Sequence, residues 1–310
     1  MVYDNILDAV GKTPMVRLRR MPEPGSAEIL VKVEGQNVGG SIKTRTALNM
    51  IRQAERAGLI NADTVIVEPT SGNQGIGLAL VGAVRGYKTV IVMPDSVSEE
   101  RRKLVRHYGA DVILVHDDGD IGKCIDECLQ TALRMRDEDP RVFVPQQFEN
   151  PNNTLAHKKY TALEIMEQVA GPIDGFCSGI GTGGTLTGIG EVLKAQYPDI
   201  EIWAVEPENA AILAGGNIGT HLQMGIGDGL IPAILNRDIY SHIYVVSDDE
   251  AIETARRLAR EEGLMAGISS GTNVAAAIRL AKKLGEGKTV VTVLPDTAER
   301  YFSTPLFTGE

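Results

Sequence analysis

The 310-residue sequence has little of several features that mark other classes of protein. It contains only 3 cysteines, an odd number that predicts no disulfide framework. No uninterrupted apolar stretch approaches the roughly 20 residues that span a bilayer, and the first residues lack the basic-then-apolar pattern of a signal peptide. We therefore expect a cytoplasmic protein without a membrane segment, whose cysteines are reduced and pack in its interior.

Tracts of lysine and arginine are also missing, and the formal net charge is -10. Such a field repels polyanions, so nucleic acid is excluded as a partner. The five histidines are scattered without the spacing of metal ligands, and no metal site is predicted. His116 beside Asp117 and Asp118 is the nearest approach to a cluster, and a turn at the end of a strand explains it.

What the sequence does have is an alternation of short β-branched runs with helical patterns, almost from end to end. This is typical of parallel strands joined by crossover helices, and it predicts an α/β fold. Ser96 followed by Glu99 matches a capping box, which predicts a helix ending near Gly109. Strands are expected at 65–67, 89–93, 111–115, 174–177, 201–205 and 289–294, and helices include 44–58, 76–84 and 249–263.

The length allows two α/β units, but no change of composition marks a linker between them. From topology we place the boundary near Pro145. Residues 1–145 form an N-terminal domain that includes a smaller, mobile, substrate-closing part, and 146–310 form the C-terminal domain. The first ~40 residues are able to pack on the other domain. A ligand is expected in the cleft between two open sheets, beyond the carboxyl ends of their strands.

A tight glycine turn at 37–43, NVGGSIK, delivers Lys43 to the start of a helical pattern. An ammonium at a helix N-terminus meets the positive end of the macrodipole, which favours the neutral, nucleophilic amine. Imine formation with an aldehyde cofactor requires such an amine. Taken alone, the pattern is better explained by a solvated lysine after a turn.

Two further glycine-rich turns stand between a strand and a helix. Residues 68–75, EPTSGNQG, offer hydroxyls, an amide and backbone N–H groups that suit a carboxylate, or simply form a capped turn. Residues 179–185, GIGTGGT, suit a phosphate. They also match GxGxxG, and Glu206 closes the next expected strand, so a dinucleotide site stays open. Ser269 opens another helical pattern, where a serine by default caps the helix.

Together, in this order, these segments resemble the cysteine synthase (O-acetylserine sulfhydrylase) family of fold-type II pyridoxal-phosphate enzymes. The resemblance runs from GKTPMVRL at 11–18 to PDTAERYFST at 295–304 and covers essentially the whole chain. It implies two open, twisted, mostly parallel sheets flanked by helices, as in the β subunit of tryptophan synthase. The active site would lie in the interdomain cleft.

The resemblance also implies the cofactor, pyridoxal 5'-phosphate, and roles for residues. Lys43 would carry the Schiff base and act as the base that removes the α-proton. Asn73 would contact the ring hydroxyl and Ser269 the pyridine nitrogen, which a hydroxyl leaves unprotonated. The phosphate would be held by Gly181, Thr182, Gly183, Gly184 and Thr185. The substrate carboxylate would be bound by Thr70, Ser71, Asn73, Gln74 and Gln147.

The expected reaction is β-replacement, in which sulfide displaces the acetate of O-acetylserine to give cysteine. A homodimer, and a partner's C-terminal peptide in the cleft, are family expectations as well. The chain departs from the family at Val38, Thr44 and Gln74, which should leave carboxylate binding intact. The departure at Asp228, where sulfhydrylases carry a small residue, has more consequence. A carboxylate there would repel hydrosulfide but could activate water.

Three alternatives therefore remain at this point. Asp228 would turn the enzyme toward consuming cysteine and releasing sulfide, unless it is a loop-capping residue that points away from the cleft. A Rossmann oxidoreductase would use 179–185 and Glu206, but it leaves Lys43, 70–75 and Gln147 without a role. A third alternative is a non-enzymatic protein that binds a peptide in its cleft.

Overall fold

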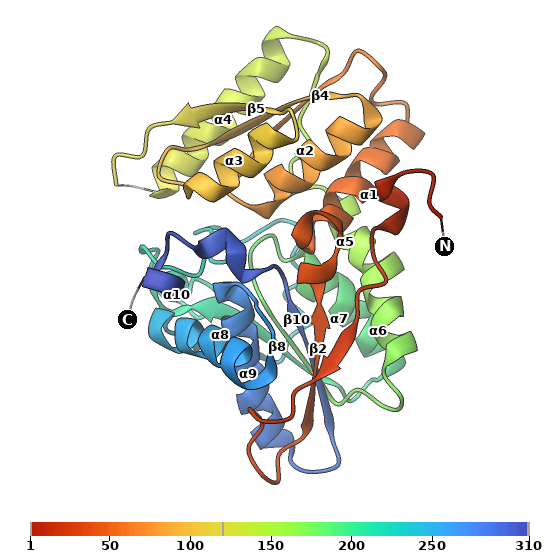
Figure 1. Ribbon diagram of the computed structural model, residues 1–310, viewed down its shortest axis with the longest axis vertical. Coiled ribbons are helices and arrows are strands. Elements are labelled where there is room, and N and C mark those ends of the chain that lie inside the picture. The colour runs from red at the N-terminus through yellow and green to blue at the C-terminus, as the bar shows by residue number, and fades with distance from the viewer. Residues whose placement is uncertain (1, 120, 309–310) are drawn as a thin grey trace.

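The computed structural model describes residues 2–119 and 121–308, and these form the predicted α/β fold. Two units are stacked on one another, each with a sheet between layers of helices (Figure 1). One sheet has 6 strands and the other 4, and nearly all neighbours in both are parallel. The two mostly parallel open sheets that the sequence predicted are therefore present.

The larger sheet has the order β1-β2-β10-β7-β8-β9, with only β1 antiparallel to its neighbour. In Figure 1 the red strand β2 runs beside the blue strand β10, although they come from opposite ends of the chain. The strands are β1 (Met15–Arg17), β2 (Glu28–Val33), β7 (Gly175–Gly179), β8 (Glu201–Pro207), β9 (His242–Val246) and β10 (Thr289–Leu294).

Helices cover both faces of this sheet, because alternate side chains of each strand are apolar on opposite faces. Phe176 and Val291 pack with residues of α6 and α7, whereas their neighbours Cys177 and Val290 pack with α8 and α9. The helices of this unit are α5 (Pro151–Ala156), a π-helical turn η4 (His157–Thr161), α6 (Ala162–Gln168), α7 (Gly184–Gln196), α8 (Asp248–Glu262), α9 (Ile268–Leu284) and α10 (Pro305–Thr308).

The smaller sheet has the order β5-β4-β3-β6 and is parallel throughout. Its strands are β3 (Val65–Pro69), β4 (Lys88–Pro94), β5 (Asp111–Val115) and β6 (Val142–Phe143). Its helices are α1 (Lys43–Arg56), α2 (Asn73–Arg85), α3 (Glu99–His107) and α4 (Ile121–Glu138). Ile66 and Ile91 face α1 and α2, whereas Val67 and Val92 face Cys124 and Cys128 of α4. All three cysteines are free and buried.

The remaining elements are short 3₁₀ helices: η1 (Ile6–Ala9), η2 (Glu34–Gln36), η3 (Val38–Gly40), η5 (Glu208–Ala210) and η6 (Ala298–Tyr301). In Figure 1 the C-terminal segment with α10 lies near the junction of the two units, below α3. Within the described chain, no helix combines the length and the apolar character that a bilayer span demands.

The six strands expected from the sequence are present, and β1, β2, β6 and β9 were missed. The capping box at Ser96 was wrong. Helix α3 begins at Glu99 after Ser98, and the Ser96 hydroxyl instead donates to Asp117 over 2.6 Å. Strands β1 and β2 pair within the larger sheet. The domain boundary near Pro145 stays a prediction.

A buried group of charged residues fixes the start of α1. The Arg45 guanidinium donates to Glu34 over 2.8 Å and to Glu164 of α6 over 2.6 Å. Lys32 of β2 lies 2.8 Å from the same Glu164. Lys32, Glu34 and Arg45 are almost fully buried. Burial alone would raise the pKa of Glu164, but Arg45 and Lys32 hold it at about 2.

Candidate active site

A cavity of about 300 Å³ lies between the two units and collects the residues singled out in the sequence. Its walls come from the ends of β3 and β7, from the start of α1 and α9, and from the loop around Gly225. Gly184 does not line the cavity but belongs to the same turn as Gly183. The predicted residues that do line it are Lys43, Thr70, Ser71, Asn73, Gln74, Gln147, Gly181, Thr182, Gly183, Thr185, Asp228 and Ser269.

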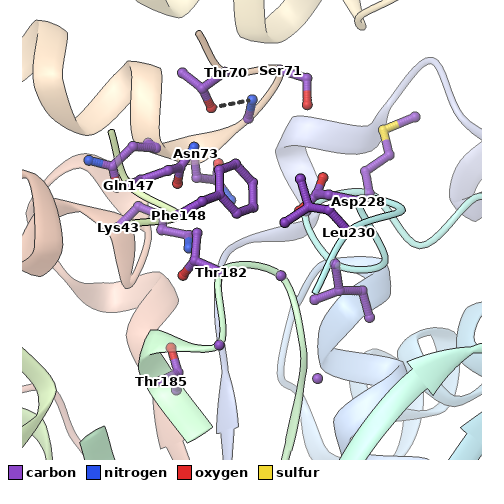
Figure 2. Close-up of a pocket in the computed structure, with 18 of the residues that line it drawn as sticks. Lys43, Thr70, Ser71, Asn73, Gln147, Phe148, Thr182, Thr185, Asp228 and Leu230 are labelled. Carbon is purple, nitrogen blue, oxygen red and sulfur yellow. Dashed lines mark hydrogen bonds between the residues drawn. The ribbon is translucent and has the colours of Figure 1, made fainter. Parts of the chain in front are cut away.

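Lys43 is the first residue of α1, as the sequence predicted. The preceding turn needs glycine, because Gly39 has φ 74° and Gly40 has φ 71°, in the left-handed region. The lysine side chain points into the cavity (Figure 2). Burial lowers the pKa of Lys43, and the charge of Asp228 opposes this shift. The structure thus holds an amine whose neutral, nucleophilic form is favoured.

The turn between β7 and α7 has the shape of an anion cradle. Gly183 precedes α7 with φ 76°, so the first N–H groups of the helix face the cavity end of β7. A Cβ on Gly181 would lie 2.5 Å from the carbonyl oxygen of Gly225, so only glycine fits. Thr182 and Thr185 add hydroxyls at the cavity wall. A phosphate group suits this turn.

The loop between β3 and α2 forms another wall. The Thr70 hydroxyl accepts the backbone N–H of Gly72 over 3.2 Å, drawn as a dashed line in Figure 2. The Asn73 amide nitrogen donates to Asp296 over 2.6 Å, while its Oδ1 atom is buried with no partner in the described structure. Gln74 accepts from Thr46 over 2.7 Å, and its amide nitrogen is likewise unpartnered. These free polar atoms can bind a polar ligand.

Ser269 lies on the first turn of α9 and is buried at the cavity wall. It does not cap the helix: Gly267 is the N-cap, and no side chain makes a capping hydrogen bond there. The default explanation of this serine is therefore wrong. The hydroxyl stands where a group in the cavity can meet it.

Asp228 also faces the cavity rather than solvent, on the side opposite Lys43 (Figure 2). Its Oδ2 atom is 3.5 Å from the position that a Cβ on Gly181 would take. Burial raises the pKa of Asp228, and the charges of Lys43, His221 and Arg101 oppose that shift. This placement does not match the alternative of a loop-capping aspartate that points away from the cleft.

Glu206, which the dinucleotide interpretation needs, is already occupied. Its two carboxylate oxygens accept the backbone N–H groups of Leu213 and Ala214 over 2.9 and 3.1 Å, and the residue is buried. Both oxygens are engaged by the chain's own backbone, and burial leaves almost no surface of Glu206 for a ribose to contact. The GxGxxG pattern therefore lacks its acidic partner.

Sequence reasoning missed three residues that support the site: Glu68, Asn153 and Asp296. Each is almost fully buried and binds a residue of the cavity wall. Glu68 stood inside the turn motif and Asp296 inside the closing motif, but their partners lie 79 and 223 residues away in sequence. The only signal was that both are acidic residues at or near the carboxyl end of an apolar strand.

Comparison with known proteins agrees with this geometry. Residues 6–296 match the family model described as "Pyridoxal-phosphate dependent enzyme". A cysteine synthase of Staphylococcus aureus is 50% identical over 305 residues, which cover 98% of this chain and 97% of that one. A solved O-ureido-L-serine synthase superposes with a TM-score of 0.93 at 42% identity, covering 100% of this chain and 96% of the other.

A hydrogen sulfide-producing enzyme from Fusobacterium nucleatum superposes with a TM-score of 0.92 at 41% identity, covering 97% of this chain and all of that one. The chain belongs to the pyridoxal-phosphate dependent enzymes of the cysteine synthase type. The residues fit the cofactor: a nucleophilic amine, a glycine cradle for its phosphate and an unpartnered Asn73 oxygen line one cavity. The oxidoreductase alternative is thereby ruled out.

Proposed function

We propose that this chain catalyses β-replacement on a serine- or cysteine-like amino acid, with the synthesis of cysteine and acetate from O-acetylserine and sulfide as its main reaction. The observation that carries the proposal is that Lys43, the 181–185 turn and the 70–74 loop all line one cavity. An amine, an anion cradle and a carboxylate site are what an amino-acid enzyme with an aldehyde cofactor needs. The sulfur chemistry of the related proteins supports the choice of nucleophile.

The cofactor would be held by Lys43, by the turn from Gly181 to Thr185, by Asn73 and by Ser269. When bound, pyridoxal phosphate supplies an electron sink that allows bonds at the α- and β-carbons of an amino acid to break. Ser269 would offer the ring nitrogen a hydroxyl, a neutral partner that would moderate that sink. This arrangement favours loss of a β-substituent.

The chain's own residues would bind the substrate and move its proton. Thr70, Ser71, Asn73, Gln74 and Gln147 would hold the α-carboxylate, using the hydroxyls and amides at the start of α2. Lys43 would take the α-proton at its Nζ atom, because burial favours the neutral amine. The cavity lies between the two units, and closure of the smaller part over a bound substrate would exclude water.

A second candidate reaction is favoured by the position of Asp228. A carboxylate on the cavity wall opposite Lys43 would repel hydrosulfide and could take a proton from water or another protic nucleophile. The enzyme would then convert cysteine to serine or another β-substituted alanine and release sulfide. The hydrogen sulfide-producing enzyme with a similar structure supports this possibility.

The two reactions are separated by substrate. The purified holoenzyme is mixed in turn with O-acetylserine, serine, cysteine and phosphoserine, and absorbance changes and products are recorded. Cysteine formation from O-acetylserine and sulfide at a higher kcat/KM than sulfide release from cysteine would support the main proposal. The reverse order would support the second. The Lys43→Ala variant should abolish both, and if it remained active the proposed role of Lys43 would be wrong.

Homodimerisation, a partner's C-terminal peptide in the cleft and a cytoplasmic location remain predictions. A mass measurement in solution tests the first, and a peptide titration of the holoenzyme tests the second. An amino-acid substrate is the partner that the cavity itself supports.

A further inference from the structure

The segment that carries Gln147 is held from both sides by two buried side chains, Glu68 and Asn153, to which the sequence alone assigned no role. It lies between β6 and α5, and Gln147 is only 5% exposed. The preceding residue, Gln146, has φ 54°, a left-handed conformation that side chains other than glycine seldom adopt. A conformation of this kind persists only where its surroundings impose it.

Glu68 holds this segment from the side of the substrate loop. Its two carboxylate oxygens accept the backbone N–H groups of Gln146 and Gln147, each over 2.9 Å. Glu68 is fully buried at the end of β3, two residues before Thr70. The strained turn and the substrate loop therefore share one rigid anchor.

Asn153 holds the same segment from the side of the phosphate turn. Its amide nitrogen donates to the carbonyl oxygen of Gln147 over 2.9 Å and to the Thr182 hydroxyl over 3.0 Å. The carbonyl can only accept, so the amide nitrogen, rather than its oxygen, must face it. Asn153 is 1% exposed and lies on the first turn of α5, which the Asn150 side chain caps.

The bond from Asn153 also sets the direction of the Thr182 hydroxyl. The Thr182 oxygen accepts from Asn153 and, more weakly at 3.4 Å, from the N–H of Gly184. With both acceptor positions engaged, the hydroxyl hydrogen is left to donate elsewhere. A Cβ on Gly184 would come within 2.3 Å of the Asn153 oxygen, so glycine is what allows this approach.

We propose that Glu68 and Asn153 are positioning residues that clamp Gln147 between them, and that Asn153 thereby couples the cofactor-phosphate turn to the substrate-carboxylate site. The proposal rests on the proposed function, since it takes Gln147 as a carboxylate ligand and Thr182 as a phosphate ligand. Glu68 acts on the substrate side alone. Asn153 acts on both sides, because one nitrogen bonds both turns.

The two positioning roles predict different effects on KM and on the rate of cofactor release in the holoenzyme. Glu68→Gln replaces one accepting oxygen by an NH₂ group that faces an N–H, so KM for the amino acid should rise roughly tenfold or more with a smaller change in kcat. The rate of cofactor release into buffer should stay at that of the parent. Asn153→Ala should raise KM and also accelerate cofactor release, each by roughly tenfold.

Controls separate the clamp from general damage. Asn152→Ala removes a neighbouring asparagine of the same helix whose side chain makes no bond described above, and both KM and cofactor release should be unchanged. If the alanine variant folds poorly, Asn153→Ser, whose shorter side chain ends in a hydroxyl donor, allows KM and cofactor release to be measured instead. The double variant of Glu68 and Asn153 should raise KM by less than the product of the single effects, because both side chains hold one residue.

Failure of the clamp and failure of the proposed function are distinguishable through Gln147→Ala. If that variant raises KM but Glu68→Gln and the Asn153 variants do not, the clamp is wrong and the carboxylate role stands. If Gln147→Ala itself leaves KM unchanged, the carboxylate role fails and the coupling falls with it. Cofactor release at the parent rate from both Asn153 variants would overturn the link to the phosphate turn, whatever the activity.

Discussion

The Asn73 amide donates to the Asp296 carboxylate over 2.6 Å, although 223 residues separate the two in sequence. Tyr301 donates to the same carboxylate oxygen over 2.7 Å, and the Arg101 guanidinium of α3 lies over the Tyr301 ring. The bond turns Asn73 so that its Oδ1 atom remains unpartnered. The C-terminal segment thus orients a residue of the substrate loop in the other unit.

Replacing Asp296 should destabilise the protein and weaken cofactor binding. In Asp296→Ala the amide of Asn73 and the buried hydroxyl of Tyr301 lose a charged acceptor, and the free energy of unfolding should fall by about 1.5–3 kcal/mol. Urea unfolding of the holoenzyme measures this change. Asp199→Ala, at an exposed aspartate, is the matched control and should leave stability within about 0.5 kcal/mol of the parent. Equal stability of the two variants would contradict the prediction.

The buried charges around Arg45 should matter more for folding than surface ion pairs do. Glu34→Ala leaves the Arg45 guanidinium with Glu164 as its remaining carboxylate partner of the two described. Removing one member of a buried pair typically lowers the free energy of unfolding by about 3–5 kcal/mol. Thermal or urea unfolding checks this value against Glu167→Ala, an exposed glutamate of the same helix as Glu164. A loss below about 1 kcal/mol would show that the cluster contributes no more than a surface pair.

Asp228 should decide which nucleophile the enzyme uses. Asp228→Asn keeps the size of the side chain but removes its charge and its ability to take a proton. Sulfide release from cysteine should fall by roughly 10²-fold, the usual contribution of a positioned general base. Cysteine formation from sulfide should be maintained or rise, because the repulsion of hydrosulfide is gone. Sulfide release from cysteine and cysteine formation from O-acetylserine and sulfide, each measured for parent and variant, test this, and unchanged release from cysteine would mean that Asp228 is no base.

Substrate affinity should depend on pH through Glu68. Burial raises the pKa of Glu68 to about 7 from its ordinary 4.5, and the two backbone N–H groups oppose the shift. For folding, such a group contributes stability that is fully present below pH 4.5 and is lost as pH rises through about 7. For substrate binding we expect the opposite pH dependence, because the ionised carboxylate accepts the two N–H groups more strongly than the neutral acid does.

KM for the amino acid should therefore rise as pH falls below about 7 in the parent, and this inflection should be absent in Glu68→Gln. The other charged groups of the cavity wall, Lys43, Glu149 and Asp228, are present in both proteins, so the difference between the two profiles isolates Glu68. Parallel profiles would show that Glu68 does not titrate in this range.

The sequence was most informative where a local pattern suffices. Strands buried on both faces read as apolar runs, which is why β4 and β10 were found. A glycine turn before a helical pattern placed Lys43 at the start of α1. Strand β6 was missed because it has only two residues, and β1 because it has three. Such strands carry too little periodicity to be recognised.

The supporting contacts of the site could not be predicted, because they join distant segments. No local pattern links Glu68 to Gln147 or Asn73 to Asp296. The prediction of a capping box at Ser96 failed for the same reason. The Ser96 hydroxyl donates to Asp117, which follows the next strand in the sequence. The family resemblance identified the residues that are expected to contact the ligand. The residues that hold these in place by hydrogen bonds could be identified only from the packing of the structure.

The pairing of β2 with β10 constrains the order in which parts of the chain can fold during synthesis. Residues 28–33 must wait for 289–294 before their edge is covered, whereas the strands of the smaller sheet lie between residues 65 and 143 and can assemble early. A nascent chain on the ribosome would complete the small unit first and carry an open strand edge until residues 289–294 have been made. Until then the unpaired N–H and C=O groups of that edge are free to pair with another chain, and folding that depends on so distant a contact is slow.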